Sequence, residues 1–230
     1  MAALRRVSAV LTLPTLMRVA SRHRAWRHFA DQPHFTTAPS LSDRAKKYSA
    51  RLAESRKVVA PQKDPAADAI RFYHRDQPYF EFTNFYPCDH LTIDGKTYPT
   101  TEHYFQAQKF AEFPDLVEKC RELATPRQCF EMVRSQRYAP YVRQDWHTGK
   151  TPVKLHVMHT AVQAKFEQNP GLSALLLGTG SRTIIEHTAN DNYWGDGGVP
   201  DWRPGMQGNQ LGQILMKVRA NLRQQLDQQV

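Results

Sequence analysis

Hydrophobic and polar residues change their spacing near residue 99, and the change separates two kinds of predicted structure. Before that point, residues 71–73 and 79–82 are predicted to form two short strands that flank a turn at 75–78. Another pair of short strands is expected around Asp94-Gly95, because both residues tolerate the positive φ angles of a tight hairpin turn. The first part of the domain is therefore predicted to be built from short strands.

Beyond residue 99, helical spacing dominates. Thr100 and Thr101 precede a predicted helix over residues 102–110, and Thr125-Pro126 has the form of a helix cap followed by proline in the first turn. Short strands followed by many helices predict an α+β fold: a single domain, predominantly helical, with a few short strands. Further helices are expected over residues 153–167, over 172–177 and from 208 to the C-terminus.

The N-terminal residues differ in composition from the rest. Residues 1–35 are rich in arginine and contain no acid before Asp31, which is typical of a mitochondrial transit peptide. A disordered tail on a cytoplasmic protein and a chloroplast signal are the alternatives. Residues 36–69 are predicted to be a linker that contains a short surface helix, and residues 70–226 to be the folded domain.

The basic charge of the chain is confined to one end. The net charge is +9 over 230 residues, and residues 1–60 alone carry 12 Lys and Arg against three Asp and Glu. The rest of the chain is balanced, so its composition gives no sign of the basic stripe that binding to a nucleic-acid backbone requires. No stretch of about 18 apolar residues occurs, and no membrane association is predicted.

The residues that commonly bind metals are not spaced for a site. Cys88, Cys120 and Cys129 are odd in number and widely separated, so we interpret them as reduced thiols. His103 has no second histidine four residues later, and His156 with His159 lacks a nearby acidic or cysteine partner in the sequence. We predict no metal and no cofactor.

The segments 82–87, 98–110, 191–195 and 208–219, with shorter ones between them, carry a shared pattern. Together they resemble the NADAR, or YbiA-like, family. The resemblance covers about residues 72–224, and the segments occur in the order found in that family. Thr83 stands where the family usually has serine, and residues 196–204 are longer and richer in glycine and proline than expected. The matching segments are residues 82–87, 98–110, Asp145-Trp146 with Met158, Lys165-Phe166, 176–180 with Glu186, 191–195 and 208–219.

The resemblance implies an N-glycosidase, a hydrolase that cleaves the bond between a phosphorylated ribose and a base-like amine. Two substrate classes are open: ribosylamino-pyrimidine phosphates of the riboflavin pathway, and ADP-ribosylated guanine in a nucleotide or a nucleic acid. The alternative is a non-catalytic module that binds NAD or ADP-ribose. No obligate protein partner is predicted.

Glu102 and Lys109 are the first two candidate catalytic residues. A carboxylate near the ribose stabilises the positive charge that develops on the ring, and the resemblance implies that Glu102 is this acid. The alternative is a glutamate that only favours the helix start. Lys109 follows two helical turns later on the same face, where it could hold a phosphate, form an imine with an opened sugar, or be a surface lysine.

A loop and several aromatic residues complete the candidate site. Asp191 is the third catalytic candidate, for binding ribose hydroxyls or protonating the base, with an Asx turn as the alternative. Trp146 and Trp194 are candidates for stacking on the base or for core packing. The remaining candidates for substrate binding are Asn84, whose amide suits the edge of a base, and Phe85, which could stack on the base or pack in the core. Gly208 and Asn209 are candidates because a helix start there would hold a phosphate or simply be capped.

Overall fold

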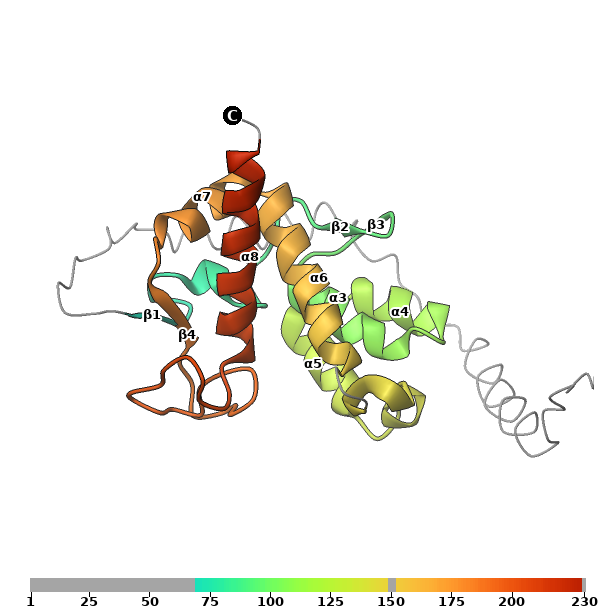
Figure 1. The fold of residues 1–230 in the computed structure, drawn as a ribbon. Helices are drawn as coiled ribbons and strands as arrows, with labels where there is room; N and C mark the ends of the chain where they lie inside the picture. The colour runs from blue at the N-terminus through green and yellow to red at the C-terminus, as the bar shows by residue number, and fades with distance from the viewer. Residues whose placement is uncertain (1–68, 149–151, 229–230) are drawn as a thin grey trace, which may run out of the picture. The chain divides into compact units, whose positions relative to one another are not determined.

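The computed structural model describes residues 69–148 and 152–228 (Figure 1). The predicted transit peptide at 1–35 lies outside the described residues. So does the predicted linker at 36–69, apart from its last residue. Within the described part, helices predominate over a few short strands, and the predicted α+β class is confirmed. No described helix is both long and apolar enough to cross a membrane.

A two-stranded parallel sheet joins distant parts of the sequence. Strand β1 (Ala69–Phe72) pairs with β4 (Thr183–Glu186), with Ile70 opposite Ile184. The pattern at the start of the domain correctly indicated β1, but β4 was not predicted. Residues 79–82 do not form the predicted second strand, because Tyr79 takes a left-handed conformation (φ 67°) and starts the 3₁₀ helix η1 (Phe80–Phe82).

The predicted hairpin around Asp94-Gly95 is confirmed. Strands β2 (Thr92–Ile93) and β3 (Lys96–Thr97) pair in antiparallel fashion. Asp94 and Gly95 have φ angles of 51° and 73°, which is the backbone conformation that a tight two-residue turn needs.

The middle of the domain contains three α-helices: α3 (Thr101–Ala107), α4 (Pro114–Arg121) and α5 (Pro126–Arg134). Both predicted caps form: Thr100 accepts a hydrogen bond from the His103 N–H, and Thr125 forms a reciprocal capping box with Gln128. α4 was not predicted. α3 ends at Ala107, before the predicted Phe110, and the chain continues directly as the 3₁₀ helix η2 (Gln108–Phe110). Two further 3₁₀ helices, η3 (Ala139–Tyr141) and η4 (Gln144–His147), follow α5.

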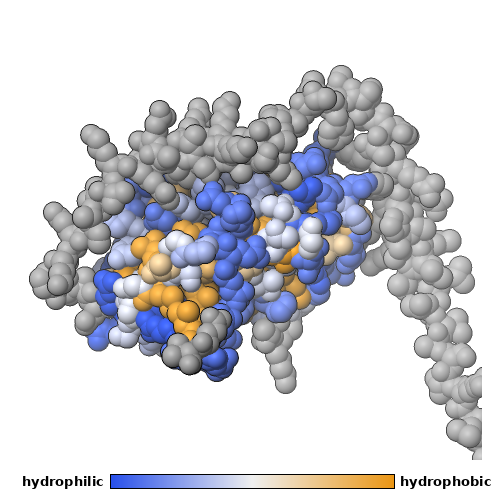
Figure 2. Space-filling model, turned by 90° about the horizontal axis from the view of Figure 1, so that it is seen from above, coloured by the Kyte–Doolittle hydropathy of each residue, from blue (hydrophilic) through white to orange (hydrophobic). Residues whose placement is uncertain are grey.

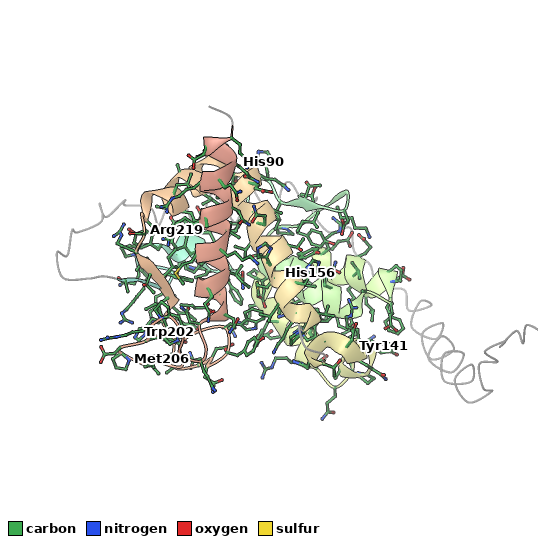
Figure 3. All side chains as sticks on the ribbon, in the orientation of Figure 1. His90, Tyr141, His156, Trp202, Met206 and Arg219 are labelled. Carbon is green, nitrogen blue, oxygen red and sulfur yellow. The ribbon has the colours of Figure 1, made fainter. Side chains whose placement is uncertain are left out.

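The last three helices pack against one another. Helices α6 (Val153–Gln168), α7 (Pro170–Gly178) and α8 (Gln210–Asp227) confirm the helices expected in this part of the chain. α6 lies between α3 and α8, and α8 also packs on β4 (Figure 1). Arg219, labelled in Figure 3, reaches from α8 to the turn after α7, where it donates hydrogen bonds to Thr179 Oγ1 and Arg182 O at 2.7 and 2.8 Å.

The core holds most large apolar side chains, but one helix keeps apolar surface. Phe72, Phe82 and Phe166 are each at most 1% exposed and pack edge to face through Phe82. The leucine-rich α7 is only half-buried, and hydrophobic residues gather on that side of the molecule in Figure 2. The three cysteines are buried and free, in agreement with their interpretation as thiols.

Candidate functional site

The start of α3 is fixed by the loop that contains Asn84. The Glu102 N–H donates to Asn84 O at 3.1 Å, and Thr101 Oγ1 donates to Asn84 Oδ1 at 2.9 Å. Asn84 is therefore next to Glu102, as a shared site requires, although one lone pair of its amide oxygen is already engaged. Phe85 packs instead against Phe80 and is half-buried there.

His103 has a structural role beside Glu102. Its Nδ1 lies 2.8 Å from Thr100 Oγ1, and its Nε2 lies 3.1 Å from Leu123 O. Burial lowers the pKa of His103 to about 4, so the ring is neutral at physiological pH. Both ring nitrogens are engaged, so of this Glu-His pair only Glu102 remains a candidate for the site.

The Glu102 carboxyl group is buried and has one close partner. Gln106, one turn further along α3, donates from Nε2 to Glu102 Oε1 at 2.6 Å. Burial raises the pKa of Glu102, while the hydrogen bond from Gln106 and the charge of Lys109 oppose that rise. Glu102 is thus a desolvated acid whose ionised form is favoured by one amide and one cation.

Lys109 is brought near Glu102, although it lies in η2 and not in α3. Its Nζ is 5.3 Å from the ring centre of Phe105 and 5.5 Å from that of Trp146. Burial lowers the pKa of Lys109 to about 8, opposed by Glu102 and assisted by other cations, including Lys154. A lysine in this environment holds an appreciable fraction of neutral, nucleophilic amine near neutral pH.

Phe105 connects the two predicted tryptophans. Its ring centre lies 5.0 Å from that of Trp146 and 5.3 Å from that of Trp194, in edge-to-face geometry. Trp146 is 2% exposed, and its buried ring lies beside the ammonium group of Lys109. Trp194 keeps accessible surface, so it is the better placed of the two to contact a planar base.

Asp191 forms the Asx turn that was the alternative to a catalytic role. Its Oδ1 accepts hydrogen bonds from the N–H groups of Tyr193 and Trp194, both at 2.8 Å. The residue is half-buried, and its charge acts on Lys154 and Glu186. Within residues 69–148 and 152–228, no hydrogen bond to its Oδ2 is found, so this oxygen can accept one from a sugar hydroxyl.

Glu186 is a site residue that sequence reasoning did not select. It ends β4 and is half-buried. Burial and then the charges of Asp191, Glu102 and Asp196 raise its pKa to about 8. These causes place Glu186 in the same group of acids as Glu102 and Asp191. Glu186 was part of the family resemblance, but it was not chosen as a candidate because the stretch before it, Ile184 and Ile185, was too short to be recognised as a strand.

Lys154 and Gln106 were also missed. Lys154, in the first turn of α6, has its Nζ 3.5 Å from the ring centre of Tyr193. Burial lowers the pKa of Lys154, while Asp191 raises it. The position of Gln106, four residues after Glu102 in the predicted helix, was a usable signal because side chains at that spacing meet on one face.

The predicted phosphate donors at the start of α8 are engaged inside the protein. The N–H groups of Asn209 and Gln210 donate to Gly195 O and Tyr193 O at 2.6 and 3.0 Å. The Asn209 side chain accepts from the Glu186 N–H and donates to Ile184 O, both at 2.9 Å. Gly208 is buried, and a Cβ there would lie 2.8 Å from two carbonyl oxygens. We therefore assign Gly208 and Asn209 to holding the loop and leave them out of the proposed site.

The described residues contain no group of three or more His, Cys, Asp or Glu side chains arranged to hold a metal ion. His156, labelled on α6 in Figure 3, is exposed, whereas His159 Nε2 is buried without a partner among these residues. The prediction that the protein uses no metal remains a prediction.

Comparison with known proteins gives consistent relatives. The NADAR domain matches residues 71–223. N-glycosidase YbiA of Escherichia coli is 43% identical over 153 residues, which cover 66% of this chain and 88% of that protein. An N-glycosidase of Nostoc punctiforme is 34% identical over 156 residues, covering 67% of this chain and 92% of that protein. A riboflavin biosynthesis protein of Vibrio vulnificus is 39% identical over 155 residues, covering 67% of this chain and 39% of that protein.

The fold is shared as well. The NMR structure of E. coli YbiA superimposes with a TM-score of 0.56 at 40% sequence identity, over 69% of this chain and 88% of the other. The matched region contains α3, the loop around Asp191 and the start of α8, and so includes every candidate residue named above. From the extent of the domain match and the identity to its relatives, the chain belongs to the NADAR domain family.

Proposed function

We propose that the protein is an N-glycosidase that hydrolyses the bond between a phosphorylated ribose and a base-like amine. The relatives named N-glycosidase support this type of activity. The observation that carries the proposal is the placement of the buried Glu102 carboxyl near Lys109, whose pKa is lowered to about 8, beside Phe105. An acid and a desolvated amine next to aromatic rings suit a ligand that joins a sugar to a base.

Glu102 supplies negative charge to the reacting sugar. When the C–N bond breaks, the base takes the bonding electron pair and the ribose ring becomes positively charged. A carboxylate in a desolvated environment stabilises this charge more strongly than it would in water. Gln106 holds the carboxylate by one oxygen, so little reorganisation is needed as the charge develops.

Lys109 acts as an amine nucleophile in this proposal, and its lowered pKa supports that role over simple phosphate binding. When the ribose ring opens, its oxygen takes a proton and C1 becomes joined to the nitrogen of the base by a C=N bond. The neutral amine of Lys109 adds to C1, the base leaves with a proton on its nitrogen, and a protonated imine then links Lys109 to the sugar. Hydrolysis of the imine returns the amine and the free ribose aldehyde. Asp191, whose Oδ1 is engaged by backbone N–H groups, binds sugar hydroxyls through its other oxygen.

Two substrate classes fit this chemistry: ribosylamino-pyrimidine phosphates, and ADP-ribosylated guanine. The riboflavin-related name of one relative supports the first class. The test is to incubate the full chain with each substrate and to measure the released base together with ribose 5-phosphate or ADP-ribose. Release from one substrate supports the activity and selects the class. Binding of ADP-ribose without any release from either substrate would instead favour a non-catalytic module.

A further inference from the structure

Glu186 is held rigidly by its backbone. Its N–H donates to Asn209 Oδ1 at 2.9 Å, and its carbonyl oxygen accepts from the Asp196 N–H at 3.0 Å. Gly195 packs so closely that a Cβ at that position would lie 2.9 Å from Glu186 O. Contacts with the start of α8 and with the loop around Gly195 therefore fix the backbone at the end of β4. The backbone position from which the Glu186 side chain extends is fixed as well.

The surroundings of the Glu186 carboxyl differ from those of its neighbours. Glu102 on α3 accepts a hydrogen bond from Gln106 and lies near Lys109, and Asp196 pairs with His187 Nδ1 at 2.7 Å. In residues 69–148 and 152–228, no hydrogen bond or ion pair to the Glu186 carboxyl is found. The charges that act on it come from the acids Glu102, Asp191 and Asp196.

Among these acids, Glu186 is the one whose surroundings most favour a bound proton. Placing several carboxylates together favours protonation of the one that has the least support from cations and hydrogen-bond donors. The pKa of Glu186, about 8, agrees with this assignment. Glu186 as a residue also keeps some accessible surface, whereas Glu102 is only 6% exposed.

We propose that Glu186 is the catalytic residue that donates a proton to the leaving nitrogen of the base, an assignment that rests on the proposed N-glycosidase function. As the C–N bond breaks, its electron pair moves to nitrogen, and the Glu186 O–H proton bonds to that nitrogen. The base leaves as a neutral amine, and Glu186 becomes a carboxylate. Water supplies the oxygen of the released sugar, and a proton from solvent restores Glu186.

The two glutamates thus have opposite tasks. Glu102, supported by Gln106 and Lys109, acts as the anion beside the sugar, and Glu186 acts as the acid beside the base. Carboxyl groups whose surroundings separate their pKa values commonly divide acid and base roles in this way. The C–N bond can break directly, with water adding to the sugar, or through an imine with Lys109. Both routes need a proton on the leaving nitrogen, so the assignment of Glu186 does not depend on which of them operates.

The protonation state is tested without any substrate. In full-length protein labelled with ¹³C at glutamate side chains, one carboxyl resonance should titrate near pH 8 and be missing from Glu186→Gln. Titration of the Glu186 resonance only near the ordinary value for glutamate, about pH 4.3, would overturn the proposal. Glu131→Gln, an exposed change on α5, is the control, and the resonance near pH 8 should remain in that variant.

Kinetics test the role in catalysis. Glu186→Gln should lower kcat ~10²-fold or more with a small change in KM, and should abolish the loss of activity that the wild type shows as pH rises through about 8. Glu186→Ala should recover activity with added acetic acid, in proportion to its undissociated form. Both variants are checked by melting curves and ligand binding, so that loss of fold is recognised.

The outcomes separate the two proposals. A wild type that releases no base from either substrate class overturns the proposed function, and this assignment with it. A wild type that is active, beside a folded Glu186→Gln that keeps its kcat and its activity loss at high pH, overturns only the role of Glu186. Reduced kcat in Glu186→Gln with an unchanged pH profile and no rescue of Glu186→Ala would likewise assign Glu186 a structural role.

Discussion

Gln106 Nε2 donates a hydrogen bond to Glu102 Oε1 across 2.6 Å, from one helical turn further along α3. The other end of that amide, Gln106 Oε1, is buried and has no partner among the described residues. A glutamine at position 102 would offer both an acceptor and a donor to Gln106. The Glu102→Gln change therefore removes the charge at this site without removing its ability to form hydrogen bonds.

We predict that Glu102→Gln lowers the single-turnover rate by ~10²–10³ while the fold and most of the ligand affinity remain. The lost interaction belongs to the charged transition state, because the bound ribose carries no positive charge before the bond breaks. Melting curves and single-turnover rates on the same sample measure both effects. Glu112→Gln, an exposed change shortly after η2, is the control. A lowered melting temperature with near-normal turnover would show that Glu102 only supports the helix start.

Lys109→Arg distinguishes an amine nucleophile from a cation that holds phosphate. Arginine keeps the charge but does not form the imine, so we expect turnover to fall at least ~10²-fold and borohydride trapping of a protein–sugar adduct to disappear. In the wild type, imine formation should increase as pH rises through about 8, because neutral Lys109 is the reactive form. Lys217→Arg, an exposed change on α8, is the control, and borohydride should trap the protein–sugar adduct in this variant as it does in the wild type. Full activity of Lys109→Arg would support phosphate binding instead.

Gly212→Ala should destabilise the protein by about 1–3 kcal/mol or more in urea unfolding. A Cβ on Gly212 would lie 2.2 Å from Ile184 O and 2.4 Å from Asn209 Oδ1, where α8 packs on β4. Gly171→Ala, on α7 with no atom within 4 Å of the new Cβ, should be neutral or stabilise by up to about 1 kcal/mol. Equal effects of the two changes would contradict the close packing of α8 on β4.

Chelators should leave turnover unchanged, because the described residues offer no cluster of metal ligands. The measurement is the initial rate after dialysis against EDTA, compared with a sample dialysed against buffer alone. Reproducible loss in EDTA that one added metal restores would disprove this prediction.

The N-terminal residues are expected to direct the protein to mitochondria. An arginine-rich segment without acids responds to the potential across the inner membrane, so residues 1–40 fused to a reporter should enter that organelle. The control replaces the six arginines of residues 1–30 with glutamine. A diffuse cytosolic signal from the unaltered fusion, or chloroplast import in plant cells, would select one of the alternatives.

Local signals in the sequence were sufficient for much of the fold. Thr100 and Thr125 were recognisable as caps, and Asp94-Gly95 as a hairpin turn, because each acts on residues only a few positions away. β4 was missed because its four residues become a strand only by pairing with β1. The strand predicted at residues 79–82 was wrong. Aromatic residues favour strands, and nothing in the local sequence indicated the left-handed backbone of Tyr79.

The same distinction holds for the site. Glu102 and Lys109 share one short segment, and their proximity followed from helical spacing. Glu186 was overlooked because its neighbours Glu102 and Asn209 come from other elements and are not visible in the local pattern. Asn209 was correctly predicted to lie at a helix start. Its N–H group donates to a carbonyl oxygen of the loop, however, and that contact arises only in the tertiary structure.

The pairing of β1 with β4 also constrains the order in which the protein can mature. Ala69 leaves the ribosome more than a hundred residues before its partner Thr183. At about 5–20 residues per second, β1 waits several seconds for the strand that completes its sheet. During that time Ile70 lacks its partner Ile184, and Glu186 does not yet exist in the chain. The nascent protein therefore passes through a stage in which it is inactive and exposes apolar surface, and chaperones have their clearest opportunity to bind it then.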